Sequence, residues 1–415
     1  MSILLPPADV RGSLIPDYEN IVRLFCSLVG TCFALDTPKS LVRKIRDIKD
    51  KYTQENVFAC AEAATSGFSF PQEVFTRDAL ALSELGSLEK LVHARQRQRR
   101  DSRFNIARCQ EVFGDDPEFS ILFQIASEGV RIDCDPSFVC CPLPDRKRQI
   151  ESRLPCTLAT HAYDLWKSGA VLLLPRSLLE AFNPHYSNMH WVPKPGVPIG
   201  RFLGDCSNRE EGNPLNSVGA KEQIKARFGA LNHPSIGDIV QMILNFAVSA
   251  GGMHNVVLWK EDVAGAFGQY NHAPADAHLL CFPVEQDLAM VYTAGMFGWT
   301  GSPYAFGPFS RAFKRQCNKR ISGCVEVYVD DFMGVSTRDR GFADQKIAQE
   351  LIVEALGPSG INLSKSFPPS RVTDLIGWTI DIDAGTLRPN AKGIEKLTLA
   401  FAYIDLTTPQ FLHTF

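Results

Sequence analysis

Hydrophobic and polar positions follow their clearest periods in the C-terminal half of the chain. After Ser235 and Asp238, which have the spacing of a capping box, apolar side chains recur at helical spacing up to Ala247. Beyond Gly251, runs of β-branched and aromatic residues that indicate strands alternate with longer segments of helical periodicity. The predicted elements are, in order, a strand at 255–261, a helix at 302–320, strands at 325–329 and 332–335, a helix at 342–356 and a strand at 361–365.

This order of elements is β-α-β-β-α-β, the split βαβ arrangement of ferredoxin-like folds. Two strands of one sheet that are joined by a right-handed helical crossover run in the same direction. The end of the first strand and the turn after the second therefore lie at the same edge of the sheet. Asp262 follows the first strand, and Asp330 and Asp331 form the predicted turn, so we expect three carboxylates to converge there.

Two adjacent aspartates are an unusual choice for a tight turn. Asp tolerates turn conformations, so a plain surface turn is one interpretation of Asp330 and Asp331. Their carboxylates repel each other, however, and apolar strands on both sides hydrate them poorly. A divalent cation removes the conflict, and carboxylates without Cys or His suit hard cations such as Mg²⁺ or Mn²⁺. A Ca²⁺ or structural site is the alternative, but the loop spacing of an EF-hand is absent.

The segment 190–205 combines strand-forming residues with Pro and Gly at its centre, which predicts an extended hairpin. Lys194 and Arg201 lie on opposite arms of this hairpin, where two basic side chains are suited to gripping a triphosphate. Helices are predicted on the N-terminal side at 158–166 and 175–182, after a loop at 135–155.

The N-terminal part of the chain looks helical and indicates little about chemistry. Helix-forming patterns cover residues 15–35 and 73–113. The second stretch contains a cluster of arginines, namely Arg95, Arg97, Arg99, Arg100 and Arg103. The cluster has two interpretations, contact with phosphates or a solvated basic face, and we favour the solvated face.

Composition limits the class of protein. A chain of 415 residues, 45% hydrophobic and 21% charged, is typical of a globular protein with two or three subdomains. The net charge is −3, so nucleic-acid binding would need a local groove. No apolar run is long enough to span a bilayer, and the N-terminus lacks the features of a signal peptide. The 12 cysteines include no Cys-x-x-Cys pair, which indicates reduced thiols in an intracellular protein of the cytoplasm or nucleus.

Several short motifs, in order along the chain, resemble those of reverse transcriptases. Tyr328-Val329-Asp330-Asp331 resembles their Tyr-x-Asp-Asp box, and Asp262 with Phe267 resembles their first aspartate motif. Residues 297–303 with Phe306 resemble the segment that supports the incoming nucleotide and the template, and Lys365 fits the lysine after the fourth palm strand. Residues 375–379 resemble the primer grip, and Lys194 and Arg201 with Asp205 resemble the fingers motifs. The segments most similar to retrotransposons of the tyrosine-recombinase (DIRS-like) group are 116–119, 128–132 and 213–216. The resemblance covers roughly residues 115–400.

The resemblance implies an α+β fold, a right-hand polymerase with fingers, a ferredoxin-like palm, a truncated thumb and a helical N-terminal extension. The extension, of unknown role, would be residues 1–110, the fingers and palm 111–400, and the start of an incomplete thumb or tail 401–415. The implied activity is RNA-directed DNA polymerisation, which adds dNTPs to a primer 3′-hydroxyl on an RNA/DNA primer–template. Two Mg²⁺ ions, or Mn²⁺, would be the cofactors. No membrane partner is implied, and the oligomeric state stays open.

The same resemblance implies roles for individual residues. Asp262, Asp330 and Asp331, with the carbonyl of Val263, would bind the metal ions. The nucleotide-binding residues would be Lys194, Arg201, Phe267, Phe297, Gly298 and Lys365, and the primer–template residues Tyr328, Gly377 and Trp378. Phe267 would be a steric gate, because a flat ring under the sugar leaves no room for a 2′-hydroxyl and offers it no hydrogen bond. An ordinary core aromatic is the alternative for Phe267.

The chain also departs from the family pattern. Phe297 stands where retroviral enzymes carry Gln, and Gly268 replaces a basic residue often found after the gate. The chain ends at Phe415, soon after residues 386–399, where a thumb would begin, and no RNase H or recombinase domain follows. Without a thumb, a polymerase should hold primer–template poorly. The alternatives are a truncated remnant that folds and binds nucleic acid without catalysis, and an RNA-templated RNA polymerase, which Phe267 disfavours.

Overall fold

The computed structural model describes residues 54–99, 103–135, 137–141, 154–194, 197–207, 214–285, 287–391 and 393–394. These residues form an α+β structure in two compact units. The larger unit consists of Phe58–Ile376 and Ile380–Thr386, and the remaining residues belong to the other. The helix that we expected at 15–35 lies outside the described residues.

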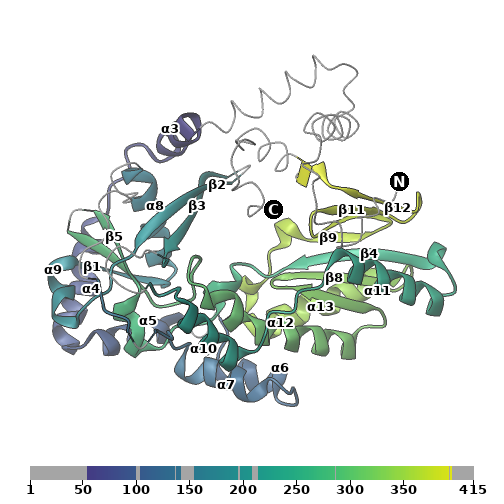
Figure 1. Ribbon diagram of the computed structural model, residues 1–415, viewed down its shortest axis with the longest axis horizontal. Helices are drawn as coiled ribbons and strands as arrows, with labels where there is room; N and C mark the ends of the chain where they lie inside the picture. Colours follow the sequence, from purple (N-terminus) through teal and green to yellow (C-terminus); the bar gives the residue numbers. More distant parts are fainter. Residues whose placement is uncertain are drawn as a thin grey trace, which may run out of the picture. The chain divides into compact units, whose positions relative to one another are not determined.

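The C-terminal half of the larger unit contains a four-stranded antiparallel sheet (Figure 1). Its strands lie in the order β7 (Cys324–Tyr328), β8 (Asp331–Thr337), β4 (Val256–Asp262) and β9 (Phe367–Ser370). Helix α12 (Gly301–Arg320) precedes β7, and helix α13 (Gly341–Leu356) connects β8 to β9. The predicted β-α-β-β-α-β order and its ferredoxin-like arrangement are confirmed.

The fourth strand of this sheet is not where the sequence pattern placed it. We expected it at 361–365, but Ile361 makes only an isolated bridge to Val263, and Leu363–Lys365 forms a 3₁₀ turn (η7). The fourth strand is β9, which follows that turn and pairs with β4. Two prolines in β9 argue against a strand in the sequence, yet they are tolerated because β9 lies at the edge of the sheet.

Both faces of the sheet are covered by helices. Alternate side chains of a strand point to opposite faces, so Trp259 and Phe332 pack in the core with α12 and α13, whereas Leu258 packs with α11 (Ile236–Ser249). Gly334 lies opposite Trp259 in the strand register, and a Cβ on Gly334 would lie 2.0 Å from Cε2 of the indole. Glycine at this position therefore makes room for a fully buried tryptophan.

The predicted helices of this half begin close to their expected residues. Ser235 Oγ accepts a hydrogen bond from the Asp238 backbone N–H (3.2 Å), and Asp238 Oδ2 accepts one from the Ser235 N–H (2.7 Å), so the capping box of α11 is confirmed. The helices predicted at 302–320 and 342–356 each begin one residue earlier.

The larger unit contains a second antiparallel sheet with helices packed around it (Figure 1), in which a strand from the N-terminal half joins two strands that lie between β4 and α12 in the sequence. Its strands lie in the order β1 (Val171–Pro175), β6 (Leu288–Tyr292) and β5 (Cys281–Glu285). The helices are α4 (Gln72–Leu85), α5 (Leu88–Arg99) and α8 (Pro155–Lys167). The hairpin predicted at 190–205 is present as β2 (Asn188–Lys194) and β3 (Val197–Asp205). The helix predicted at 175–182 is a short α9 (Arg176–Leu179) followed by a 3₁₀ turn, η2 (Glu180–Phe182).

The helical stretch predicted at 73–113 consists of α4, α5 and α6 (Ile106–Phe113). Its arginine cluster is only partly the solvated face that we favoured, and Arg100 lies outside the described residues. Arg97 is exposed, but Arg95 and Arg99 are buried, and their guanidinium groups donate hydrogen bonds to backbone carbonyls of neighbouring elements. Local spacing could not show this burial, because it depends on which segments pack against the polar face of α5.

The remaining elements are α3 (Gln54–Thr65), α7 (Phe119–Glu128), α10 (Val218–Phe228), the 3₁₀ turns η3 (Met253–Asn255), η4 (Ala266–Gln269), η5 (Pro274–Leu279) and η6 (Pro358–Gly360), and the strands β10 (Val372–Leu375), β11 (Trp378–Asp381) and β12 (Thr386–Pro389). In the smaller unit, the Asn390 N–H donates to the Gly377 carbonyl at 3.0 Å. Among the described residues, no helix is both long enough and apolar enough to cross a membrane.

Candidate metal centre

Strand register places two aspartates beside each other at one edge of the four-stranded sheet. Asp262 is the last residue of β4, Asp331 is the first residue of β8, and the two are register partners. Asp330 precedes Asp331 in the turn from β7. One carboxylate oxygen from each of the three residues lies within 4.8 Å of the other two. The convergence that strand order predicted is therefore present.

The turn itself differs in detail from the prediction. The two-residue loop is Val329–Asp330, not Asp330–Asp331, because Asp331 already pairs with Tyr328 at the start of β8. Val329 has a φ of 55°, a left-handed conformation that β-branched residues rarely adopt and that costs about 1–2 kcal/mol. Tertiary contacts must hold this shape, since turn preferences alone would place Gly or Asn there.

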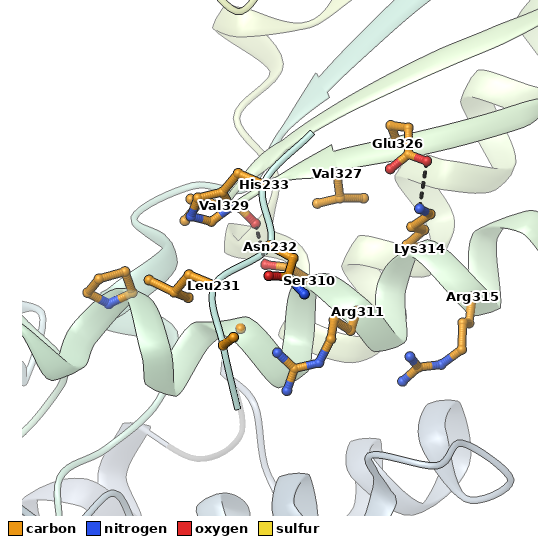
Figure 2. A pocket seen from close by; sticks show the side chains of 13 residues that line it. Leu231, Asn232, His233, Ser310, Arg311, Lys314, Arg315, Glu326, Val327 and Val329 are labelled. Atoms are coloured by element: carbon orange, nitrogen blue, oxygen red, sulfur yellow. Dashed lines mark hydrogen bonds and ion pairs between the residues drawn. The ribbon is translucent and has the colours of Figure 1, made fainter. Parts of the chain in front are cut away.

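Two hydrogen bonds from other elements hold the turn. Ser310 Oγ on α12 donates to the Val329 carbonyl at 2.6 Å, and Figure 2 shows the two residues facing each other across this bond. From the other side, the Val263 N–H donates to the Asp330 carbonyl at 2.9 Å. The backbone that follows Asp262 is thereby tied directly to the backbone of Asp330.

Two lysines and an asparagine contact the carboxylates. Lys365 Nζ lies 2.7 Å from Asp262 Oδ1 and 2.9 Å from its Oδ2. Asn362 Nδ2 donates to Asp262 Oδ2 at 3.0 Å, and Lys260 Nζ lies 2.9 Å from Asp331 Oδ1. The two ammonium groups offset part of the negative charge that three neighbouring carboxylates bring together.

The pKa values of Asp330 and Asp331 reflect the electrostatic cost of placing the carboxylates together. Burial, and then the charges of Asp262 and Asp331, raise the pKa of Asp330 to about 6. Burial also raises the pKa of Asp331, while the Lys260 ammonium opposes that rise. A cation at this edge would favour the ionised form of each carboxylate, because its charge would outweigh the mutual repulsion.

The donor set fits a hard cation. In the part of the chain that the structure describes, these aspartates are the only group of three or more His, Cys, Asp or Glu side chains that could hold a metal ion. All side-chain donors are oxygens, which suits Mg²⁺ or Mn²⁺ and does not suit a soft metal. The peptide of Val263 is buried and fixed by its N–H, and the predicted use of its carbonyl as a ligand stays a prediction.

A second group of predicted residues comes together around an aromatic pair. The rings of Phe267 and Phe297 lie 4.9 Å apart, and the Arg201 guanidinium carbon of β3 lies 4.6 Å from the centre of the Phe297 ring. Phe297 is 38% exposed and Phe267 is partly buried, so Phe267 is not a fully enclosed core aromatic. A Cβ on Gly298 would lie 2.0 Å from the Gly204 carbonyl oxygen, so glycine allows this close approach to β3.

The other predicted residues have varied surroundings. Tyr328 is 38% exposed, and its ring lies 4.7 Å from that of His233. Gly377 (φ 85°) and Trp378 belong to the smaller unit. Lys194 ends β2, and its side chain lies outside what the structure describes. Their roles toward primer, template or nucleotide stay predictions.

Three residues of the centre were missed by the sequence reasoning. Lys260 could have been found, because it lies two positions before Asp262 and therefore on the same face of the strand. No local sequence pattern indicates Asn362 or Ser310, because only the tertiary fold places them next to Asp262 and Val329.

A cavity of about 350 Å³ lies behind the turn, between α12, β7 and the loop 230–233 (Figure 2). Its basic side chains are engaged by acidic partners. Lys314 Nζ lies 2.6 Å from Glu326 Oε1, and Arg311 Nε donates to Glu118 Oε1 at 2.6 Å. The cavity therefore offers no excess positive charge from these residues.

Comparisons with known proteins give similarity at the level of solved structures. No protein-family model matches the sequence, and no curated protein matches it. A foamy viral protease–reverse transcriptase dRH in complex with dsDNA is similar at 15% identity and a TM-score of 0.40, over 69% of this chain and 47% of that one. The foamy viral protease–reverse transcriptase in complex with dsDNA is similar at 17% identity and a TM-score of 0.42, over 69% of this chain and 56% of that one. The same protein in complex with an RNA/DNA hybrid is similar at 17% identity and a TM-score of 0.44, over 69% of this chain and 36% of that one. The chain thus spans about a third to somewhat more than half of these structures.

Proposed function

We propose that the chain is a reverse transcriptase of a retrotransposon, most like the tyrosine-recombinase (DIRS-like) group, which adds dNTPs to a primer 3′-hydroxyl. The observation that carries this proposal is the convergence of Asp262, Asp330 and Asp331 at one sheet edge, with a ligand oxygen of each within 4.8 Å of the others. Burial and the charges of Asp262 and Asp331 raise the pKa of Asp330, so the three carboxylates are costly to keep together, and a role with a hard cation explains why they are.

The three aspartates, with the carbonyl of Val263, would hold the ions. Two Mg²⁺ or Mn²⁺ ions bound there would supply activation of the primer 3′-hydroxyl and charge stabilisation at the departing pyrophosphate. The chain's own residues prepare the centre, because Asn362 orients the Asp262 carboxylate while the Val263 N–H fixes the Asp330 backbone. This arrangement supplies the positioning and electrostatics on which in-line transfer mainly depends.

The aromatic pair would receive the incoming nucleotide. Arg201, with Lys194 on the opposite arm of the hairpin, would bind the triphosphate, as a guanidinium and an ammonium are suited to do. Phe267 would lie under the sugar and exclude a 2′-hydroxyl, while Phe297 packs against its ring. Gly298 would hold the nucleotide-binding segment close against β3, and Lys365 would contact the phosphates.

An RNA/DNA primer–template would lie along the sheet edge. Tyr328 would contact it beside the metal ions, since its ring is partly exposed next to Asp331. Gly377 and Trp378 would form the primer grip. The proposed preference for dNTP over rNTP substrates distinguishes this function from that of an RNA-templated RNA polymerase.

Primer extension tests the proposal directly. The full chain is given a primed RNA template, dNTPs and Mg²⁺, and we expect extension that stops with EDTA and returns with added Mg²⁺. Asp330→Asn should lose at least about 100-fold in rate, because it removes a charged ligand. Asp339→Asn, the same change at an exposed position after β8, should extend like the wild type. The proposal fails if the wild type extends no primer with Mg²⁺ or Mn²⁺, or if Asp330→Asn extends equally well.

A further inference from the structure

One face of helix α5 is buried, and its character changes along the helix. The buried positions follow helical spacing and are Leu88, Leu91, Val92, Arg95, Gln96 and Arg99. The first half is apolar, whereas the second half buries two guanidinium groups and an amide. Buried polar groups need hydrogen-bond partners, and Gln96 and Arg99 find theirs partly in the segment 264–272, which follows Asp262.

Arg99 makes three separate contacts from its buried position. Its Nη2 donates to the Gly268 carbonyl at 3.1 Å, its Nη1 to Asn271 Oδ1 at 3.3 Å, and its Nε to the Ser168 carbonyl at 3.1 Å. The residue is only 6% exposed, and burial is the main cause that lowers its pKa to about 10. The planar guanidinium supplies donors to all three acceptors, which an apolar side chain cannot do.

Two glutamine side chains, one on α5 and one within the segment, hold the rest of residues 264–272. Gln96 Nε2 donates to the His272 carbonyl at 2.7 Å and to the Thr293 carbonyl at 2.9 Å. Within the segment, Gln269 Nε2 donates to the Ala264 carbonyl at 2.5 Å. The segment is therefore fixed at its C-terminal end by Gln96 and in its middle by Arg99.

Phe267 lies inside this braced segment. It belongs to η4 and directly precedes Gly268, whose N–H also bonds back to the Gly265 carbonyl at 2.7 Å. Gly268 has no side chain of its own to anchor the turn, so the contact from Arg99 to its carbonyl is an anchor from outside. A shift of this peptide would move the Phe267 ring relative to Phe297.

We propose that Arg99 is a positioning residue for sugar selection, which holds the η4 turn so that Phe267 stays at the distance that excludes a 2′-hydroxyl. The inference rests on the proposed function, because it takes Phe267 as the residue under the sugar. It also gives the helical N-terminal region a role, since α5 supplies the brace.

The test compares Arg99→Met with Arg95→Met in the full chain. Arg95 is a matched control, because it is also buried on α5 but donates to the Trp166 carbonyl and to Gln98, outside the segment 264–272. For each variant, kcat/KM is measured for a dNTP and for the matching rNTP on the same primer–template. Phe267→Ala serves as the reference for a missing gate.

The ratio of dNTP to rNTP efficiency is the deciding quantity, because a general loss of stability lowers both efficiencies together. We expect Arg99→Met to lower the ratio about fivefold or more, in the direction of Phe267→Ala, with Arg99→Lys between it and the wild type. Arg95→Met should keep the ratio within about twofold of the wild type. Equal ratios for Arg99→Met and Arg95→Met would overturn the proposal.

A second readout separates this proposal from the proposed function. Amide hydrogen exchange of peptides covering residues 264–272 reports the brace without any catalysis. We expect faster exchange in Arg99→Met than in the wild type, and unchanged exchange there in Arg95→Met. If the wild type extends no primer, the proposed function fails, and the sugar-selection role fails with it. Amide hydrogen exchange would still decide whether Arg99 braces the η4 turn. Unchanged exchange in Arg99→Met would overturn the brace in every case.

Discussion

Asp262 and Asp331 are register partners on adjacent strands, so their carboxylates lie side by side as a direct consequence of strand pairing. Asp330 joins them because it directly precedes Asp331 in the two-residue turn Val329–Asp330. At this scale each side chain has a distinct task in the proposed centre. The task proposed for Phe267 can be separated from that of the aspartates, since the ratio of dNTP to rNTP use reports selection of the sugar.

Phe267→Ala should raise the use of rNTPs relative to dNTPs by about tenfold or more, because it opens space for the 2′-hydroxyl. The measurement is kcat/KM for both nucleotides in primer extension with Mg²⁺. Phe342→Ala, at an exposed position on α13, is the control and should leave the ratio unchanged. An unaltered ratio in Phe267→Ala would show that this ring does not act as a gate.

The three aspartates could be predicted from the sequence because strand order alone places them at one edge of the four-stranded sheet. Lys260 could also have been predicted, through the two-residue period of β4. Asn362 and Ser310 could not be predicted, because their contacts depend on how η7 and α12 approach the sheet.

At the scale of elements, the errors of prediction have physical causes. The fourth strand was predicted at 361–365, whereas the structure forms it at β9, whose two prolines are tolerated only because the strand lies at a sheet edge. The polar face of α5 was read as solvated because local spacing does not reveal a buried partner. The turn at Val329 was misplaced because its left-handed φ of 55° is imposed by contacts from α12 and from Val263, which follows β4, and not by turn preference.

Ser310→Ala should weaken this imposed turn, because it removes the hydrogen bond to the Val329 carbonyl. We expect a loss of about 1 kcal/mol in the free energy of unfolding and a severalfold lower extension rate. Urea unfolding and single-nucleotide incorporation measure the two effects. Ser249→Ala on α11 is the matched control, since that hydroxyl bonds only to the Phe246 carbonyl of its own helix. Equal extension rates for the two variants would show that Ser310 does not support the turn.

At the scale of the whole larger unit, the N-terminal helices are part of the same packed body as the sheets. Arg315 on α12 makes two hydrogen bonds to Asp116, at 3.0 and 2.5 Å, and Arg311 makes two to Glu118, at 2.6 and 3.2 Å. Paired contacts of this kind give fixed geometry. They join residues nearly two hundred positions apart, so the sequence could not reveal them, whereas the order of the elements around the four-stranded sheet follows from local periodicity.

Buried histidines make the stability of this unit depend on pH. Burial lowers the pKa of His161 and of His185 to about 4, and that of His272 to about 3, below the value of about 6.5 in an unfolded chain. Between about pH 6.5 and 4 the unfolded state therefore binds more protons, and the free energy of unfolding falls as pH falls. The slope is at most about 1.4 kcal/mol per pH unit for each histidine. Asp330, with its raised pKa, opposes this trend.

His161→Phe tests this dependence at one site. The imidazole stacks on Phe202 with ring centres 4.7 Å apart, and its Nε2 is buried without a hydrogen-bond partner, so Phe can take its place. Urea unfolding at pH 7.0 and 5.5 should show a smaller loss of stability in the variant than in the wild type. Above pH 7.5 the two proteins should respond alike to pH. Identical losses between pH 7.0 and 5.5 would contradict the assignment.

Cleavage of the chain by bound iron locates the metal centre most directly. Fe²⁺ is expected to replace Mg²⁺ at an all-oxygen site, and with ascorbate and peroxide it cuts backbone close to where it is bound. We expect cuts near Asp262 and near residues 328–331 in the full wild-type chain, suppressed by excess Mg²⁺. The cuts should disappear in Asp330→Asn and persist in the surface control Asp339→Asn. Absence of cuts at these two segments, or equal cutting in Asp330→Asn, would contradict a metal centre formed by the three aspartates.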